Sequence, residues 1–373
     1  MLDIKQKIRN FAENQDIKSM NKQNRLCYIS RNYYNLTSAG NKAKTDNEDT
    51  LDEMGAVNLG LHRTVRNSKI IAFFLDLAGI LRACVLLKKG DVLFLQYPVK
   101  KYFSFLCTIA RMKGAMTVSL IHDIGSIRTH RLTPQQEVNR LSNSDYIIAS
   151  NDKMVEWLKS HDMRKPMGSL GIFDYRAPYF NQTSPTNPVK DEAESNIKIV
   201  YAGALHVKKN PFLLQLSQKL TAWNLIIYGN KEGLSGWEEN PHIIHKGFAQ
   251  SDEFIRSVDA DFGLVWDGDS LETCSGVFGE YLRWNSPHKV SFYLRAGLPV
   301  IIWKEAAVTP ILEKEGVCIA IATLQELEEK LKELTSDDIT KLKQNAKRLA
   351  ERLNQGYFLR QALDIYLSTN QLC

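Results

Sequence analysis

The chain has 373 residues, of which 44% are hydrophobic, 24% charged and 9% aromatic, a composition that predicts about two folded domains and excludes disordered, collagen-like and low-complexity chains. Its six cysteines never form a Cys-x-x-Cys pair, which excludes zinc ribbons and thioredoxin-type motifs and favours a reducing compartment. The net charge of +6 is uneven, because residues 1–188 hold 27 Lys and Arg against 17 Asp and Glu while residues 189–373 hold 21 against 25.

From residue 26, the first half alternates short apolar runs with helical patterns, which predicts a parallel sheet with helices on both faces. The expected strands are Leu26–Ser30, Val92–Gln96, Val118–Ile121 and Tyr146–Ala149, and the expected helices are Asn41–Met54, Ile70–Leu87, Lys100–Met112 and Asp152–Lys159. The stretch Ile70–Leu87 is interrupted by Asp76 and Arg82, so we do not expect it to span a membrane.

A segment rich in Pro, Asn, Thr and Ser at 179–196 predicts a linker, after which the alternation restarts. The expected strands are then Ile197–Tyr201, Trp223–Tyr228, Phe262–Trp266 and Pro299–Trp303, and the expected helices are Pro211–Leu220, Asp252–Val258, His288–Arg295, Thr323–Asn354 (one or two) and Tyr357–Leu367. We therefore predict an extension at 1–25, one α/β domain at 26–178, a second at 197–356 and a final helix within 357–373.

Several specific motifs are absent. No GxGxxG follows a strand, which weakens a dehydrogenase or epimerase reading, and no GxxxxGK[ST], GxSxG or HExxH occurs, which argues against P-loop NTPases, α/β-hydrolases and zinc proteases. The polar residues 1–25 lack the apolar segment of a secretory signal, which predicts a cytoplasmic protein. No dense basic run with interleaved aromatics is present, so we expect no nucleic acid partner.

Loops at the carboxyl ends of parallel strands are where α/β sheets bind ligands. The loop Ser30–Lys42 follows the first strand, and its small residues Thr37, Ser38 and Gly40 would let backbone amides approach a phosphate or a sugar at a helix N-terminus. An ordinary polar turn is the alternative for this segment.

The turn Val200–Pro211 joins a strand to a helix through Gly203, Lys208 and Asn210. Asn210 suits an N-cap, and lysines beside a helix N-terminus predict a diphosphate site. A capped helix with solvated lysines is the alternative. Tyr228, at the end of the strand Trp223–Tyr228, joins the same set of candidate nucleotide-sugar residues.

The segment Asn285–Val300 begins a helix with a polar cluster that contains His288, Lys289 and Ser291. Lys289 and Ser291 would stand near the positive end of the helix dipole, where an anion is stabilised. A short buried helix is the alternative.

His122 and Asp123 follow a strand directly, and either side chain at such a position suits the acceptance of a proton from an attacking hydroxyl. A simple turn is the alternative. Asp267 and Asp269 imitate the paired carboxylates that hold a metal-bound diphosphate, but we favour a solvated acidic loop or a lid at this place, and expect no metal site.

The motifs taken together resemble those of a known group. They occur in the order Tyr28–Asn32, Thr37–Gly40, His122–Asp123, Tyr201–Gly203, Phe262–Gly268 and Pro287–Lys289. Over residues 26–368 the chain resembles bacterial GT-B sugar transferases, a group that includes β-1,6-galactofuranosyltransferases of surface-polysaccharide clusters and glucosyltransferases that glycosylate adhesins. The first 25 residues lie outside the resemblance.

The resemblance implies two facing Rossmann-like domains with a central cleft, the second binding a UDP-sugar and the first binding a glycan or lipid-linked acceptor. It implies that Lys289 neutralises the donor diphosphate beside His288 and Ser291, that no metal or other cofactor is needed, and that the last helix crosses back to the first domain. One departure is that Glu280 has no second Glu at the Glu-x7-Glu spacing, so the signature of retaining enzymes cannot be used. For an inverting reaction we expect His122 or Asp123 as the base.

The expected function is transfer of galactofuranose, galactose or glucose from a UDP-sugar during surface polysaccharide or glycoprotein synthesis. A non-catalytic subunit that binds a UDP-sugar or a glycan is the alternative. The basic first half is compatible with peripheral contact with an anionic membrane, at its inner face, and homo-oligomer formation is left open.

Overall fold

The computed structural model describes residues 25–33, 39–98, 102–177, 197–206, 208–232, 236–237 and 239–370. The predicted extension apart from Arg25, the whole of the predicted linker, and Thr37 and Ser38 lie outside these residues.

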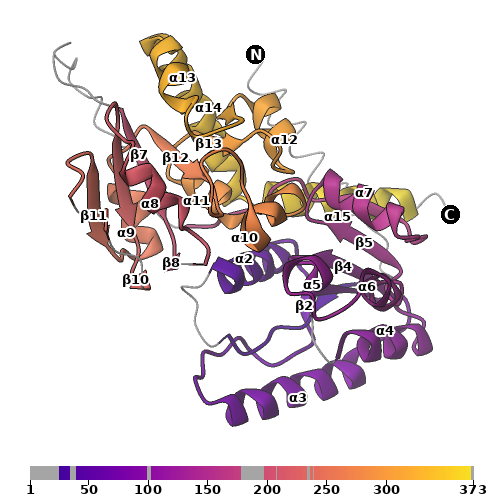
Figure 1. The fold of residues 1–373 in the computed structure, drawn as a ribbon. Coiled ribbons are helices and arrows are strands. Elements are labelled where there is room, and N and C mark those ends of the chain that lie inside the picture. The colour runs from indigo at the N-terminus through magenta and orange to yellow at the C-terminus, as the bar shows by residue number, and fades with distance from the viewer. Residues whose placement is uncertain are drawn as a thin grey trace, which may run out of the picture.

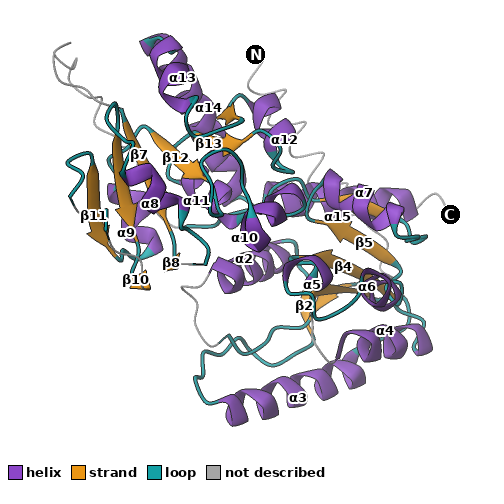
Figure 2. Ribbon diagram, in the orientation of Figure 1, coloured by secondary structure: helices purple, strands orange, loops and turns teal. Residues whose placement is uncertain are grey.

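The first sheet has six parallel strands in the order β2-β1-β3-β4-β5-β6. They are β1 (Leu26–Tyr28), β2 (Val57–Asn58), β3 (Val92–Tyr97), β4 (Met116–Ile121), β5 (Tyr146–Ala149) and β6 (Met167–Ser169). Helices cover both faces (Figures 1 and 2). The central strands β3, β4 and β5 are buried almost throughout, which is why they read as short continuous apolar runs.

The helices of this domain are α2 (Ala39–Glu53), α3 (Lys69–Leu86), α4 (Phe103–Met112), α5 (Gly125–Arg128), α6 (Pro134–Leu141) and α7 (Asp152–Ser160). Local capping explains several of their starts. The Thr133 side chain caps α6 in a reciprocal capping box with Gln136, and the Asn151 side chain accepts a hydrogen bond of 2.9 Å from the Met154 amide at the start of α7.

The second sheet also has six parallel strands, in the order β11-β9-β7-β12-β13-β14. They are β7 (Lys198–Ala202), β9 (Asn224–Tyr228), β11 (Ile243–Gly247), β12 (Phe262–Val265), β13 (Val300–Trp303) and β14 (Cys318–Ile321), with a small separate ladder of β8 (Leu205–His206) and β10 (Lys231–Glu232). Its helices are α8 (Phe212–Ser217), α9 (Ser251–Ser257), α10 (Gly276–Glu280), α11 (His288–Arg295), α12 (Thr309–Glu315), α13 (Leu327–Glu333) and α14 (Ser336–Asn354), with a 3₁₀ turn at Tyr281–Arg283.

Each sheet contains one point where the strand order reverses. In the first sheet the chain moves outward from β1 to β2 and then returns to the other side of β1 as β3. In the second it moves from β7 through β9 to β11 and returns beside β7 as β12. Open α/β sheets bind ligands at the carboxyl ends of the two strands that flank this reversal. We therefore expect ligand sites at the carboxyl ends of β1 and β3 in the first domain, and of β7 and β12 in the second.

The last helix, α15 (Tyr357–Asn370), continues from α14 and packs against α2 and β6 of the first domain (Figure 1). Its start is held by Asp174, whose carboxylate accepts hydrogen bonds from the amides of Phe358 and Leu359 at 3.1 and 2.8 Å. The chain thus crosses between the domains twice, at the segment after β6 and again at α15.

No helix within the described ranges is long and apolar enough to cross a membrane. The most apolar of them, α3, carries Lys69, Asp76 and Arg82 along its 18 residues.

Candidate functional site

A cluster of charged and aromatic side chains occupies the reversal point of the second sheet. The strand β7 ends at Ala202 and is followed by Gly203 with a φ of 145°, a backbone conformation that favours glycine. A Cβ on Gly203 would come within 3.2 Å of the Cε of Lys289, which arrives from the first turn of α11. The bare Cα therefore makes room for the lysine to lie across the end of β7.

Asp267, just beyond the end of β12, organises the cluster. Its Oδ1 is 3.4 Å from the Nζ of Lys289, and its Oδ2 is 3.6 Å from the Nζ of Lys209. The Tyr201 hydroxyl donates to the same Oδ1 at 2.9 Å and accepts a hydrogen bond from the Asn210 side-chain amide. The Nζ of Lys289 also lies 3.7 Å from the centre of the Tyr201 ring. One carboxylate thus holds two ammonium groups at one sheet edge.

The electrostatics of this edge suit an incoming polyanion. Burial lowers the pKa of Lys289 to about 7, even though Asp267 opposes that shift, so the amine gains its full charge when a further anion arrives. The helix α11 begins at His288, and Pro287 before it supplies no side-chain cap. The first amides of α11 and the positive end of its dipole are therefore available to a phosphate.

The second carboxylate of the acidic pair is arranged differently. Asp269 is exposed and accepts a hydrogen bond from the Ser275 hydroxyl, whereas Asp267 is buried among the lysines. Throughout the ranges given above for the structure, no group of three or more His, Cys, Asp and Glu side chains is arranged to hold a metal ion.

Asp123 lies at the carboxyl end of β4 in the first domain and contacts the second domain. Its Oδ1 accepts a hydrogen bond of 3.2 Å from the hydroxyl of Tyr281, and its Oδ2 pairs with Arg128. The Tyr281 hydroxyl in turn accepts from the Ile124 amide at 3.0 Å. Burial raises the pKa of Asp123, and the Arg128 guanidinium opposes that shift. A tyrosine of the second domain therefore orients a carboxylate of the first.

His122 belongs to a stack of three rings across the domain junction. Its imidazole lies against Phe173 with centres 5.0 Å apart and planes 12° apart, and Phe173 lies against His288 with centres 4.6 Å apart. Burial lowers the pKa of His288 to about 4 and that of His122 well below its usual value, with the Lys44 ammonium adding to both shifts. Both imidazoles are therefore neutral at pH 7.

The hydrogen bonds of His122 define its tautomer. Its Nε2 lies 2.9 Å from the side-chain oxygen of Gln96, which also accepts from the Asn47 amide at 2.9 Å. Because that oxygen is an acceptor, Nε2 carries the proton and Nδ1 keeps its lone pair. Among the described residues Nδ1 finds no hydrogen-bond partner, and it is buried.

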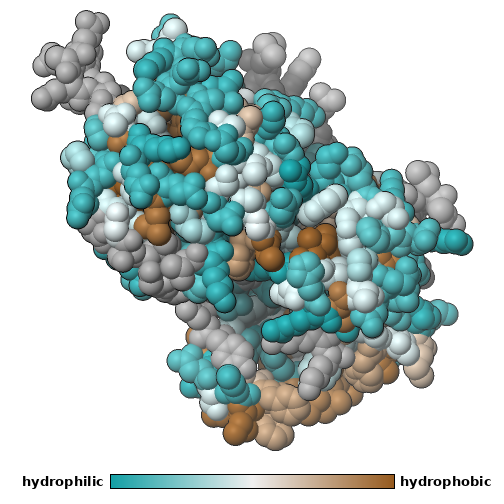
Figure 3. Space-filling model, in the orientation of Figure 1, coloured by the Kyte–Doolittle hydropathy of each residue, from teal (hydrophilic) through white to brown (hydrophobic). Residues whose placement is uncertain are grey.

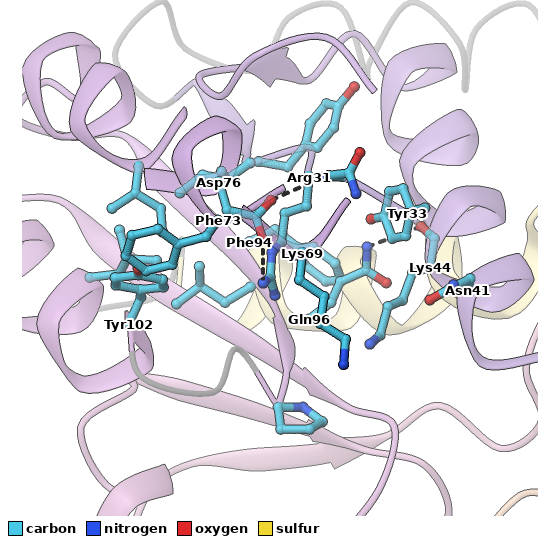
Figure 4. Close-up of a pocket in the computed structure, with 17 residues that line it drawn as sticks. Arg31, Tyr33, Asn41, Lys44, Lys69, Phe73, Asp76, Phe94, Gln96 and Tyr102 are labelled. Carbon is cyan, nitrogen blue, oxygen red and sulfur yellow. Dashed lines mark hydrogen bonds and ion pairs between the residues drawn. The ribbon is translucent and has the colours of Figure 1, made fainter. Parts of the chain in front are cut away.

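A cavity of about 590 Å³ lies at the reversal point of the first sheet (Figure 4). Its lining includes residues after β1, on β3, on α2 and on α3, among them Arg31, Tyr33, Lys44, Lys69, Phe73 and Gln96. Figure 4 shows the side chains of Lys44 and Lys69 reaching toward the same open side. Its volume is typical of small-ligand sites, and Gln96 connects its wall directly to His122.

The structure brings together several residues that the sequence singled out. Gly203, Asn210 and Lys289 meet at the second reversal point, whereas His288 and His122 lie on opposite faces of Phe173. The Lys208 side chain is exposed, and its backbone amide donates to the His206 ring at 3.0 Å. Its neighbour Lys209, not Lys208, contacts Asp267.

Other predicted residues lie in supporting positions. The Ser291 hydroxyl is buried and donates to the Phe173 carbonyl at 2.5 Å, so it ties the two domains together. Tyr228 packs edge-on against Phe254, and its carbonyl accepts from the Gly203 amide at 3.0 Å. Gly40 is exposed in the first turn of α2 with open space around its Cα.

Sequence reasoning missed four side chains of this region: Lys209, Gln96, Phe173 and Tyr281. Lys209 was visible as half of a Lys-Lys pair, but only the fold decides which lysine turns inward. The other three stand in segments without a motif, so a single sequence gives no signal for them.

Comparisons with known proteins agree with this architecture. Residues 26–172 match the family model described as glucosyltransferase 3-like, N-terminal domain, and residues 199–365 match that of the glucosyltransferase 3-like, C-terminal domain. Together the two matches span most of the chain, so the resemblance predicted from the motifs is confirmed.

Individual relatives are similar over both domains. The chain is 29% identical over 340 residues to the β-1,6-galactofuranosyltransferase WbbI of Escherichia coli K12, which covers 89% of this chain and 95% of that protein. It is 22% identical over 289 residues to glucosyltransferase 3 of Streptococcus parasanguinis, covering 74% and 78%. The structure of sucrose-phosphate synthase from Thermosynechococcus elongatus superposes with a TM-score of 0.58 at 12% identity, covering 94% of this chain and 99% of that one. The chain therefore belongs to the glucosyltransferase 3-like family and is a glycosyltransferase with the GT-B fold.

Proposed function

We propose that the chain transfers a hexosyl group from a UDP-sugar to a glycan or lipid-linked acceptor, in the synthesis of a surface polysaccharide or glycoprotein. The observation that carries the proposal is Lys289, which is partly buried against Asp267 and lies across Gly203 at the reversal point of the second sheet. Because the relative WbbI is named a β-1,6-galactofuranosyltransferase, UDP-galactofuranose is the first donor to test. UDP-galactose and UDP-glucose follow.

The cluster suits the leaving group of such a reaction. As the bond between the sugar's anomeric carbon and the diphosphate oxygen breaks, UDP takes the electron pair and its negative charge grows. Lys289, Lys209 and the first amides of α11 then stabilise that charge where it develops. Because side-chain cations supply this stabilisation, we propose that transfer needs no metal ion.

Asp123 is a better base for the acceptor hydroxyl than His122. A third of the Asp123 side chain is exposed, and burial raises the pKa of its carboxylate toward the working range of a base. His122 holds its only free lone pair on a buried Nδ1, and burial makes that ring a weak base. We propose that His122 has a positioning role, because its ring stacks on Phe173, which in turn stacks on His288.

The acceptor is proposed to enter through the cavity of the first domain. The cavity has the size for one or two sugar rings, and its aromatic and amide side chains (Phe73, Tyr33 and Gln96) offer the stacking and hydrogen bonds that sugars use. Gln96 joins the cavity to His122, and Asp123 is the next residue along the chain. We therefore propose that the acceptor hydroxyl approaches Asp123 from the side of this cavity.

Binding and turnover test different parts of the proposal. In a thermal-shift screen with EDTA present, UDP raises the melting temperature and GDP, CMP and NAD do not, because only the bound folded state is stabilised. In a UDP-release assay with the three UDP-sugars and a simple alkyl glycoside acceptor, Lys289→Met lowers kcat by about 10²- to 10³-fold.

Lys341→Met, at an exposed position of α14, is the matched control and keeps wild-type turnover. Asp123→Asn loses transfer but keeps the UDP-induced thermal shift. The donor-site assignment is wrong if folded Lys289→Met protein binds UDP and turns over as the wild type does. A strict requirement for a divalent ion would contradict the proposed metal-free mechanism.

A further inference from the structure

The helix α3 is apolar on two opposite faces. One face packs inward through Ala72, Gly79, Ile80 and Ala83. The opposite face carries large apolar side chains that recur at helical spacing and are 71%, 62%, 54% and 76% exposed: Ile70, Phe74, Leu81 and Val85. A surface helix of a globular protein ordinarily has one apolar face, which packs on the core, and a polar face toward solvent. The second apolar face of α3 departs from this pattern and indicates contact with a partner.

The apolar surface continues from α3 onto its neighbour α4, which packs beside it. Phe105 and Met112 on α4 and Met116 at the start of β4 are also exposed. Figure 3 shows a hydrophobic patch along the lower edge of the molecule, where α3 and α4 lie in Figure 1. The row of exposed apolar side chains on α3 extends from residue 70 to residue 85, a length of about 22 Å. An ordinary protein surface carries such side chains singly, without a continuous row of this length.

The charges around this surface have one sign. Residues 66–91 and 103–116 contain seven Lys and Arg and two Asp. The seven cations are Arg66, Lys69, Arg82, Lys88, Lys89, Arg111 and Lys113. Both acids are used internally, because Asp76 pairs with Arg31 at 3.1 Å and Asp91 pairs with Arg25 at 2.6 Å. The surface therefore presents a positive field with an apolar centre.

We propose that the outer face of α3 and α4 docks the protein on an anionic lipid bilayer. Apolar side chains flanked by Lys and Arg are the composition of helices that lie in the membrane interface, and each Lys or Arg near an anionic surface strengthens such binding. A symmetric contact with a second copy would instead bring seven cations against seven cations. The proposal does not depend on the proposed function, because docking is measured without any sugar nucleotide.

Docking in this way would orient the cavity of the first domain. Lys69, Phe73 and Ile80 belong to α3 and also line the cavity. When the outer face of the helix lies in the headgroup layer, the cavity lies directly above that layer. An acceptor attached to a membrane lipid would then reach the cavity from below.

The test is co-sedimentation of the full chain with vesicles of phosphatidylcholine, with and without 30% phosphatidylglycerol. The wild type sediments with the anionic vesicles, and 0.5 M NaCl weakens binding because it screens the cations. The double variant Phe74→Ser/Val85→Ser binds at least about tenfold more weakly, since two apolar side chains no longer insert. Lys88→Gln/Lys89→Gln loses about fivefold per lysine.

Matched controls come from the second domain. Phe248→Ser removes a phenylalanine that is 56% exposed there, and Lys341→Gln removes an exposed lysine of α14; both bind vesicles as the wild type does. Each variant is also tested for its melting temperature and its UDP-induced shift, so that loss of folding is recognised. If the double apolar variant does not fold, the single exposed change Val85→Ser replaces it.

Three results would overturn the proposal. The wild type fails to sediment with anionic vesicles, or it sediments equally with neutral ones. The third is a dimer in analytical ultracentrifugation that Phe74→Ser/Val85→Ser dissolves while vesicle binding is absent, which would make this face an interface between two copies of the chain.

Discussion

Lys289 should make the affinity for UDP depend on pH above neutrality. In the empty site burial lowers the pKa of this lysine to about 7, and a diphosphate beside it raises that pKa again by favouring the charged form. At pH 8 only about a tenth of the empty sites carry the charge. Binding at that pH therefore takes up about 0.9 proton per UDP, by the linkage between protonation and binding.

The size of the effect follows from the same value. Between pH 7.5 and 8.5 the fraction of charged Lys289 falls about eightfold, so the dissociation constant of UDP rises about eightfold. UDP itself does not titrate in this window, because a terminal phosphate with a second pKa of about 6 is already ionised. A change in affinity within this pH range therefore reports the protonation of Lys289 and not that of the UDP phosphates.

Isothermal titration calorimetry at pH 8.0 in two buffers of different ionisation enthalpy measures the proton uptake, and a titration series from pH 7.5 to 8.5 measures the affinity. Lys289→Arg remains charged throughout, so its proton uptake falls to near zero and its affinity becomes independent of pH. Lys341→Met retains the wild-type dependence. Wild-type binding without proton uptake, and with constant affinity over this range, would refute the reasoning.

The same burial has a consequence for stability. Because the folded-state pKa of Lys289 lies below its unfolded value, the unfolded chain binds more protons between about pH 7 and 10.5. The penalty is complete below pH 7 and fades as pH rises through that window. Lys289→Met removes the penalty and leaves Asp267 its contacts with Lys209 and Tyr201. We expect the variant to be more stable at pH 6 by about 1–3 kcal/mol, measured by denaturant unfolding, while it loses UDP affinity.

Three further substitutions probe the site and its support. Gly203→Ala places a Cβ 3.2 Å from the Lys289 chain at a φ of 145°, so we expect UDP affinity to fall about tenfold or more by calorimetry; an unchanged affinity would show that the glycine is not needed there. Tyr281→Phe removes the hydroxyl that donates to Asp123 and holds its pKa down, so the acid limb of the kcat/KM profile moves to higher pH; a limb that stays in place would argue against Asp123 as the base. Asp174→Ala leaves two amides of α15 without an acceptor and costs about 1–3 kcal/mol in denaturant unfolding; full stability would mean that water replaces the carboxylate.

The alternation of short apolar runs with helical patterns along the sequence was sufficient to predict the two parallel sheets. The helix His288–Arg295 was predicted with its observed bounds, because Pro287 stands before its first residue and Gly297 soon after its last. The elements that were not predicted include the strands β2, β6, β11 and β14 and the helices α5, α6, α10 and α12. In β11 the burial varies from residue to residue, since it is an edge strand with one partner, so its composition lacks the apolar run of a central strand.

The site was less predictable than the fold, for physical reasons. A loop motif fixes the backbone at a strand end, but not which of two adjacent lysines turns inward, as Lys208 and Lys209 show. Phe173 and Tyr281 act only because a second domain packs against them. The pattern of Ile70–Leu87 predicted a helix, and α3 is one. It could not show which apolar face would be buried, because both faces satisfy the same period.

Contacts across the domain junction bring together two sequence motifs, those of His122 and His288, that were each ambiguous alone. His122 and His288 were each ambiguous in sequence, as an ordinary turn and as part of a short buried helix. The structure places both on Phe173, a residue of the segment that crosses between the domains, and the Ser291 hydroxyl donates a hydrogen bond to the Phe173 carbonyl. The proposed base and the proposed phosphate-binding lysine therefore have their positions set by the same short segment. Because Asp123 belongs to the first domain and Lys289 to the second, a change in domain orientation would move these two groups relative to each other. The crossing segment, more than either loop alone, is therefore the part of the chain that keeps donor and acceptor in register.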